Sequence, residues 1–227
     1  MIQAYLNNKI RISENGAIAE NEDFKTSSVI GLLQYLPDEI FWDIFKKCSE
    51  HLEINPKINS FDFWPKFNPE KTENSDYVEP DVLIEADGID VIIEVKKEDG
   101  GGQKSEQWKN EIQAVLNKQR DKNEKKRIIL IALGDNNTED KQPQIKVGKE
   151  SFNVYRVSWQ GLVDAVCDKY DELLNNCGDG NVCRIINEVQ QLFRKLGMER
   201  TVWLESLYSD LKINTSVLKG WNVKKWK

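Results

Sequence analysis

Two acidic residues and a lysine stand where a short hairpin would bring them together. Asp87-Gly88 is typical of a two-residue hairpin turn, because glycine accepts the positive φ that such a turn requires. It joins the strand-like segments 79–86 and 89–96, so the numbers of paired residues sum to 175. Asp81 then faces Glu94, and two directly opposed carboxylates repel each other. A bound divalent cation would offset that repulsion.

Lys96 shares a face of the hairpin with Glu94, since residues two apart on a strand point to the same side. Glu94 lies in an apolar run, where an unpaired charge is costly to bury. Oxygen ligands without His or Cys favour a hard cation such as Mg²⁺ or Mn²⁺, and the Val95 carbonyl could join them. A plainer interpretation has Asp81 capping the turn after Pro80 and Lys96 only neutralising Glu94. The convergence favours a metal site for phosphodiester chemistry.

Pro80-Asp81 followed by Glu94-Val95-Lys96 resembles the signature of the PD-(D/E)xK nuclease superfamily, which has the restriction-endonuclease-like fold. The resemblance extends to Gln107, which lies near the start of a predicted helix. It also extends to an acidic residue of the first helix, a position for which Glu22 and Glu20 compete.

This resemblance implies a Mg²⁺- or Mn²⁺-dependent endonuclease or exonuclease with DNA as its default substrate, in restriction, repair or defence. A homodimer or a partner subunit is a further expectation. The alternative is a catalytically inactive module of the same fold that binds nucleic acid or a protein partner, and the acidic pI of about 5.1 favours it. In the nuclease interpretation the implied catalytic residues are Asp81, Glu94, Lys96, Glu22 and Gln107, and the implied metal ligands are Asp81, Glu94 and Val95.

Apolar periodicity predicts helices alternating with strands, and therefore an α/β fold. A helix over 105–122 would connect strand 89–96 to strand 127–133 in parallel. The resemblance adds a restriction-endonuclease-like three-layer core, with a mixed central β-sheet flanked by helices and a helical C-terminal extension. The other predicted helices are 26–36, one opening at Pro37, 158–174 and 182–196; the other predicted strands are 52–58, 79–86 and 152–157; segments 59–77 and 134–150 are predicted loops.

Residues 1–175 are predicted to form the nuclease-like domain, with 176–227 as an extension packed on it. The chain lacks a membrane-spanning run and a signal peptide, so a cytoplasmic protein without membrane partners is expected. The net charge of −6 is unevenly spread. Residues 36–99 carry 17 acidic and 7 basic side chains, whereas 104–127 carry 8 basic and 4 acidic ones. That contrast suits an enzyme that holds both cations and phosphates, although charged runs are also ordinary solvated faces.

Overall fold

The computed structural model describes residues 2–9, 22–97, 102–134, 144–176 and 178–201. Glu20 and the part of the predicted extension after residue 201 lie outside these ranges. None of the helices within them combines the length and apolar composition needed to cross a lipid bilayer.

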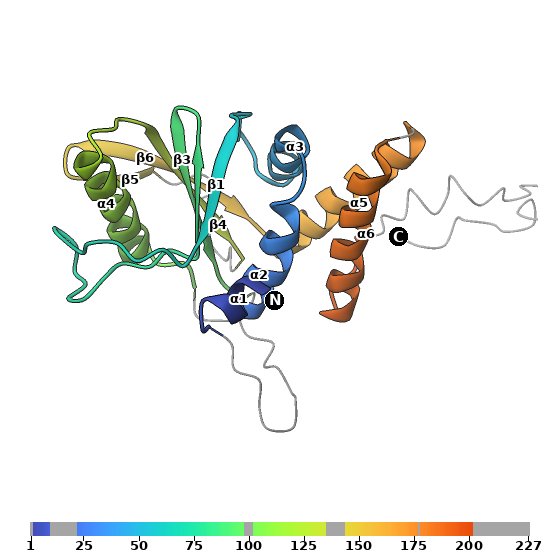
Figure 1. Cartoon of the computed structure of the whole chain (residues 1–227), viewed down its shortest axis with the longest axis horizontal. Coiled ribbons are helices and arrows are strands. Elements are labelled where there is room, and N and C mark those ends of the chain that lie inside the picture. The colour runs from blue at the N-terminus through green and yellow to red at the C-terminus, as the bar shows by residue number, and fades with distance from the viewer. Residues whose placement is uncertain (1, 10–21, 98–101, 135–143, 177, 202–227) are drawn as a thin grey trace, which may run out of the picture.

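The described chain forms a mixed sheet flanked by helices, which confirms the α/β class (Figure 1). Six strands lie in the order β1-β2-β3-β4-β6-β5. β3, β4 and β6 are parallel neighbours, and the remaining pairs are antiparallel. The helices are α1 (Ile2–Leu6), α2 (Glu22–Leu33), α3 (Asp38–Cys48), α4 (Ser105–Asp121), α5 (Trp159–Asn175) and α6 (Gly180–Lys195). The strands are β1 (Ile58–Phe63), β2 (Val82–Ala86), β3 (Ile89–Val95), β4 (Arg127–Leu133), β5 (Gln144–Val147) and β6 (Glu150–Val157).

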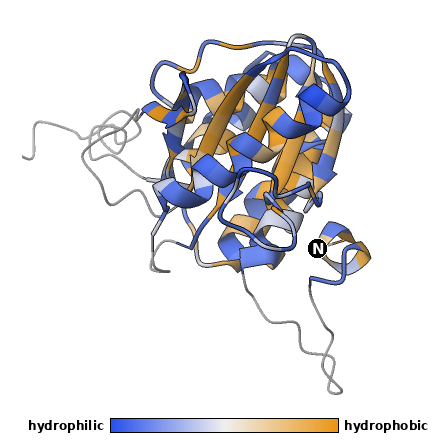
Figure 2. Cartoon of the chain, turned by 90° about the vertical axis from the view of Figure 1, so that its left-hand side faces the viewer, coloured by the Kyte–Doolittle hydropathy of each residue, from blue (hydrophilic) through white to orange (hydrophobic). Residues whose placement is uncertain are grey.

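Each face of the sheet packs into its own hydrophobic core. Alternate residues of β3 divide between them: Val91 and Ile93 face the core with α2, α3, α5 and α6, whereas Ile92 faces the core with α4. All seven β3 residues are buried, as expected for a central strand covered on both faces. Figure 2, seen from the α4 side, shows the hydrophobic strands behind mostly hydrophilic helix surfaces. The result is three layers, with β3 in the middle of the molecule.

The β2–β3 hairpin has the predicted register. Leu83 pairs with Ile92 and Ala86 with Ile89 across the Asp87-Gly88 turn. Gly88 has a φ of +74°, which explains why glycine stands there. α4 then connects β3 to its parallel neighbour β4, as the sequence predicts. These two connections place the end of β3, the start of α4 and the residues before β2 side by side.

Two strand predictions were wrong. The predicted strand 52–58 lies too early, because β1 begins at Ile58 and occupies part of the predicted loop 59–77. The sequence of β1 lacks a regular apolar alternation, because the exposed residues Asn59 and Asp62 interrupt it. The predicted loop 134–150 also contains β5, a four-residue strand at the sheet edge. Ile145 is its one buried residue. Short edge strands bury too few residues to leave a clear sequence pattern.

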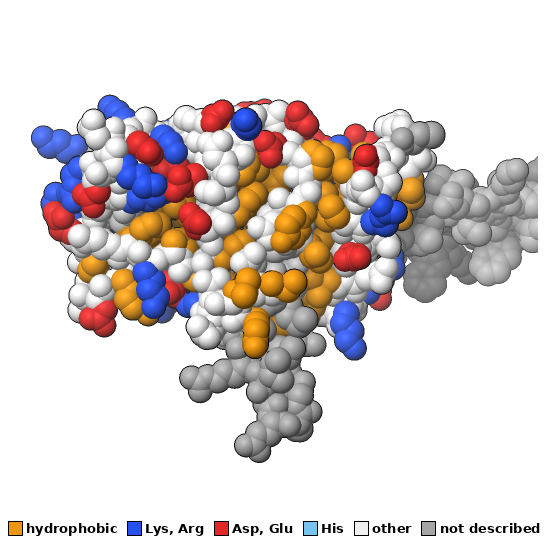
Figure 3. Space-filling model, in the orientation of Figure 1, with side chains coloured by type: hydrophobic (Ala, Val, Ile, Leu, Met, Phe, Trp, Pro, Cys, Tyr) orange, Lys and Arg blue, Asp and Glu red, His pale blue; other side chains and the backbone are white. Residues whose placement is uncertain are grey.

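Sequence patterns also left α1 unpredicted. It packs on α2, where the backbone N–H of Ala4 donates a 2.8 Å hydrogen bond to Ser27 Oγ. Its other side leaves Ile2, Tyr5 and Leu6 largely exposed. Figure 3 shows hydrophobic side chains gathered across this part of the surface, over α1 and α2.

Gly134 ends β4 at the point where three strands converge. Its N–H donates to the Val157 carbonyl at 2.8 Å, and its φ is +84°. The neighbouring Lys96 carbonyl accepts a 2.8 Å hydrogen bond from Trp159 Nε1. A Cβ on residue 134 would overlap the Lys96 carbonyl oxygen and lie 2.8 Å from Trp159 Nε1. The close approach of β4 to the end of β3 therefore requires glycine.

We expect Gly134→Ala to destabilise the protein by more than about 3 kcal/mol, because a strained φ is combined with a backbone clash. Gly88→Ala is the matched control, since its φ is also positive but nothing lies within 4 Å of the added Cβ. Its cost should be roughly 1 kcal/mol. Urea unfolding of both variants measures the difference. Equal losses of unfolding free energy in the two variants would show that Gly134 does not pack closely against the Lys96 carbonyl.

Candidate metal centre

Three carboxylates from separate parts of the chain converge at the carboxyl end of β3. Glu22 opens α2, Asp81 lies immediately before β2, and Glu94 lies on β3. One oxygen of each lies within 4.8 Å of the others. This spacing lets a single cation contact all three, and oxygen ligands suit Mg²⁺ or Mn²⁺. Of the two acids that competed for the first-helix position, the described one, Glu22, reaches the cluster.

Asp81 is held by two hydrogen bonds. Its Oδ1 accepts from Trp64 Nε1 at 3.0 Å, and its Oδ2 accepts from the backbone N–H of Val95 at 2.8 Å. The regular β2–β3 ladder ends one pair earlier, at Val82 and Ile93, so Asp81 meets β3 through its side chain. Burial, followed by the charge of Glu94, raises the pKa of Asp81 well above its usual value. The hydrogen bonds fix the orientation of a carboxylate that would gain from a cation.

Lys96 supplies a positive charge among these acids. Its Nζ contacts Glu94 Oε1, lies 3.3 Å from Glu22 Oε1 and lies 3.2 Å from the Val95 carbonyl oxygen. Burial alone would lower the pKa of Lys96, but the adjoining Glu94 carboxylate outweighs burial and the pKa is raised. Lys96 therefore stays an ammonium. One such charge does not balance three carboxylates.

Gln107 and Val95 also lie at the site, so the structure brings together all six residues that the sequence nominated. Gln107 Nε2 donates to Glu94 Oε1 at 2.6 Å from the first turns of α4. The Val95 carbonyl oxygen lies at the site because it is 3.2 Å from Lys96 Nζ.

Sequence reasoning missed Gln103, which anchors this end of the sheet. Its Nε2 lies 3.1 Å from the Glu94 carbonyl oxygen and 3.3 Å from that of Leu133, and so bridges β3 and β4. Its Oε1 accepts a 2.8 Å hydrogen bond from Trp108 Nε1. The residue stands in a glycine-rich loop with no pattern around it, and nothing in the sequence singles it out.

Sequence reasoning also missed Glu111. It lies one turn after Gln107 on α4, between the apolar residues Trp108 and Ile112, and is 1% exposed. Its carboxyl group lies within hydrogen-bonding reach of the side chains of Glu94 and Gln107. Burial, followed by the charge of Glu94, raises its pKa well above the usual value. An acid inside an apolar helix stripe is the sequence signal that could have identified it.

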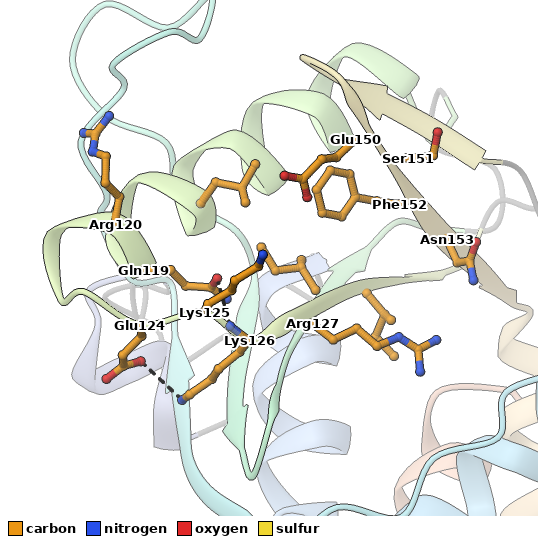
Figure 4. Close-up of a pocket in the computed structure, with 13 residues that line it drawn as sticks. Gln119, Arg120, Glu124, Lys125, Lys126, Arg127, Glu150, Ser151, Phe152 and Asn153 are labelled. Atoms are coloured by element: carbon orange, nitrogen blue, oxygen red, sulfur yellow. Dashed lines mark hydrogen bonds and ion pairs between the residues drawn. The ribbon is translucent and has the colours of Figure 1, made fainter.

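A separate cavity of about 610 Å³ opens at the opposite end of the sheet (Figure 4). Basic residues around the start of β4, Lys125, Lys126 and Arg127, line one side of it. Lys126 lies 3.4 Å from the buried Asp90, which also accepts a 2.9 Å hydrogen bond from Gln119. The buried acid of this region is therefore balanced by a nearby lysine, whereas at the other end of β3 three carboxylates share Lys96.

The chain is similar to a known protein over most of its length. An uncharacterized protein of Pasteurella multocida strain Pm70 is 26% identical over 224 residues, covering 90% of this chain and 82% of the relative. No protein-family profile matches the chain, and no solved structure matches it. The relative's name assigns no activity, so the functional argument rests on the geometry.

We expect Glu111→Gln to raise the melting temperature of the metal-free protein, and more so at high pH. Because the folded pKa of Glu111 is raised, the stability linked to its neutral form is fully present below the unfolded value of about 4.3 and is lost as the pH rises through the folded pKa. The variant cannot ionise. Its advantage over the wild type should therefore widen as the pH rises above the unfolded value of about 4.3, in thermal melts with a chelator.

Glu85→Gln is the control with the opposite sign. Burial opposes ionisation of Glu85, but its contact with Lys118 prevails and lowers its pKa. That contribution is present above the unfolded pKa and is lost as the pH falls, so Glu85→Gln should lower the melting temperature at neutral pH. If Glu111→Gln is also less stable than the wild type throughout, the contacts of the Glu111 carboxyl with Glu94 and Gln107 stabilise the fold by more than its burial costs.

Proposed function

We propose that the protein is a Mg²⁺- or Mn²⁺-dependent nuclease of the PD-(D/E)xK type that hydrolyses DNA. The observation that carries the proposal is the convergence of Glu22, Asp81 and Glu94 around Lys96. Structural ion pairs neutralise charge, whereas this cluster keeps an excess of negative charge in a buried place. A divalent cation is the group that would balance it.

The arrangement of elements supports the same proposal. The acids lie on a β-hairpin and on the first turn of a helix, and α4 begins beside them after β3. In open α/β sheets, ligands bind beyond the carboxyl ends of the parallel strands. The free N–H groups in the first turn of α4 favour phosphate at that place. A restriction-endonuclease-like core, the fold that the sequence resemblance implies, has this order of hairpin, helix and parallel strand.

Hydrogen bonds within the protein orient the proposed metal ligands Asp81 and Glu94. Asp81 is fixed by Trp64 and by the Val95 N–H, and Gln107 fixes Glu94, so the carboxylates are oriented before any ligand arrives. Such preorganisation lowers the cost of stabilising a charged transition state. A bound divalent cation supplies a water of lowered pKa and neutralises the scissile phosphate.

Lys96 is placed to act on the reacting oxygens. It remains protonated beside Glu94, and Glu22 holds its Nζ from the other side. An ammonium in this position can donate to a water molecule and to a phosphate oxygen on which negative charge develops. Val95 contributes its carbonyl oxygen at the edge of the same space. In this proposal these residues position the nucleophile and stabilise the charge that forms.

DNA is the proposed substrate because the site suits phosphodiesters and because the segment after the hairpin is basic. Residues 104–127 carry 8 basic and 4 acidic side chains and include the whole of α4. Basic side chains along α4 and at the start of β4 attract a polyanion to the protein, while a cation at the carboxyl end of β3 would neutralise the reacting phosphate.

Asp81→Ala should abolish tight Mn²⁺ binding, because it removes the carboxylate that two hydrogen bonds orient toward the cluster. Isothermal calorimetry with MnCl₂ measures this. Asp62→Ala, which removes an exposed carboxylate from β1, is the matched control and should bind Mn²⁺ like the wild type. Unchanged affinity in Asp81→Ala would move the metal centre elsewhere.

Lys96→Ala and Glu94→Gln should fold but cleave DNA at least about 100-fold more slowly, since charge stabilisation of this kind typically contributes that much. The assay is Mg²⁺- or Mn²⁺-dependent nicking of supercoiled plasmid. Lys118→Ala serves as the control, because Lys118 also pairs with a glutamate, Glu85, but lies near the other end of α4.

Full activity in Lys96→Ala would refute the proposed role of Lys96. If the wild type cleaves neither single-stranded nor double-stranded DNA or RNA with either ion, the nuclease proposal fails. The alternative, a nuclease-fold module that binds nucleic acid or a protein partner, then becomes the better account.

A further inference from the structure

Trp64 binds Asp81 twice and has an unusual backbone conformation. Its backbone N–H donates to the Asp81 carbonyl oxygen at 3.0 Å, and its Nε1 donates to Asp81 Oδ1 at 3.0 Å. Its φ is +50°, in the left-handed region that aromatic residues rarely occupy. Such a conformation persists only where the surrounding structure holds it in place. The contacts around the Trp64 ring therefore determine how firmly Asp81 is oriented.

Lys9 is the cation beside that ring. Its Nζ lies 5.7 Å from the centroid of the Trp64 ring, which is within the range of a cation–π contact. The same Nζ pairs with Glu79 Oε1, two residues before Asp81. The side chains of Lys9 and Glu79 are only 25% and 15% exposed, so solvent screens this pair weakly. Lys9 thus connects the Trp64 ring to the segment that carries Asp81.

Helix α1 fixes the position of Lys9. The helix is followed by Asn8 at a φ of +56°, and the Lys9 N–H donates to the Ala4 carbonyl at 2.8 Å, as in a Schellman motif. Ala4 is fully buried, and its own N–H donates to Ser27 Oγ of α2. α2 begins with one of the three clustered acids. α1 therefore connects Lys9 to the helix that provides one of the proposed metal ligands.

We propose that Lys9 is a positioning residue for the metal centre. It holds the Trp64 indole against Asp81, and through α1 it connects the helix of Glu22 to the segment before β2. This role rests on the proposed function, since it concerns the orientation of the proposed cation ligands. Groups that hold metal ligands in place typically contribute about 10- to 100-fold to metal affinity.

A role limited to neutralising charge makes the opposite prediction. A lysine that only offset the negative charge of Glu22, Asp81 and Glu94 would repel an incoming cation. Removing such a lysine would strengthen Mn²⁺ binding. Removing a positioning lysine weakens Mn²⁺ binding, because Asp81 loses its orientation. The sign of the change in affinity therefore separates the two roles.

Calorimetric titration of the full-length protein with MnCl₂ measures that sign. We expect Lys9→Met to weaken Mn²⁺ binding about 10-fold. Lys9→Arg should restore most of the affinity, because arginine also pairs with a carboxylate and lies over an indole ring.

Lys66→Met is the matched control for the lost charge and the lost ring contact. Lys66 stands two residues after Trp64, and its Nζ lies 4.4 Å from the centroid of the Tyr77 ring. Lys66 is exposed, so its charge is screened and the variant should change the affinity for Mn²⁺ less than about twofold.

A second measurement follows the Trp64 indole without metal. NMR of isotope-labelled tryptophan reports the exchange of each indole hydrogen with solvent, and Trp64→Phe assigns the signal of Trp64. We expect this hydrogen to exchange faster in Lys9→Met than in the wild type, because the bond to Asp81 protects it. The buried indole of Trp42, which donates to a backbone carbonyl, should exchange at the same rate in both proteins.

Weaker Mn²⁺ binding and faster exchange of the Trp64 indole in Lys9→Met, with recovery in Lys9→Arg, support the positioning role. Unchanged or tighter binding in Lys9→Met overturns that role and leaves the proposed nuclease intact. Unchanged exchange of the Trp64 indole, or equally accelerated exchange of Trp42, also overturns it. If the wild type binds no Mn²⁺, the proposed metal centre fails and the role of Lys9 fails with it.

Discussion

The rest of this structure depends on several acidic side chains being buried close together at the end of β3. Asp81, Glu94 and Glu111 are 8%, 2% and 1% exposed, and Lys96 is the ammonium in contact with Glu94. Buried charges destabilise a fold unless they are paired. A protein that keeps them needs two extensive cores to offset the cost, and this sheet is packed on both faces.

The covalent order of the chain explains why the acids meet. A tight turn fixes the hairpin register, and the register brings the residue before β2 to the end of β3. Gly134 lets β4 and β6 lie close to the backbone of Lys96. At the same edge, Trp159 donates a hydrogen bond to the Lys96 carbonyl and Gln103 donates one to the Glu94 carbonyl. The site is thus positioned by backbone contacts on several sides rather than by one flexible loop.

The hairpin and the central strands were predictable because local patterns determine them. Asp87-Gly88 fixes the turn, and the apolar runs of β3 and β4 can only be buried. β5 and α1 were not predictable, since short elements bury few residues. Glu111 was missed for a different reason: an acid inside an apolar helix stripe is a visible signal, but only the packed sheet shows that this position is buried. The nearness of Glu22 depends on how α2 packs, which sequence periodicity does not specify.

A Mn²⁺-soaked crystal examined at the manganese absorption edge tests the central claim most directly. The account predicts an anomalous peak between the carboxylates of Glu22, Asp81 and Glu94, with ligand distances near 2.1 Å as expected for an octahedral hard cation. The account would be contradicted if a crystal saturated with Mn²⁺ showed no anomalous peak among these residues, or showed manganese bound only at surface acids. Lys96 alone would then have to balance the buried acids, and the cluster would be a structural ion-pair network.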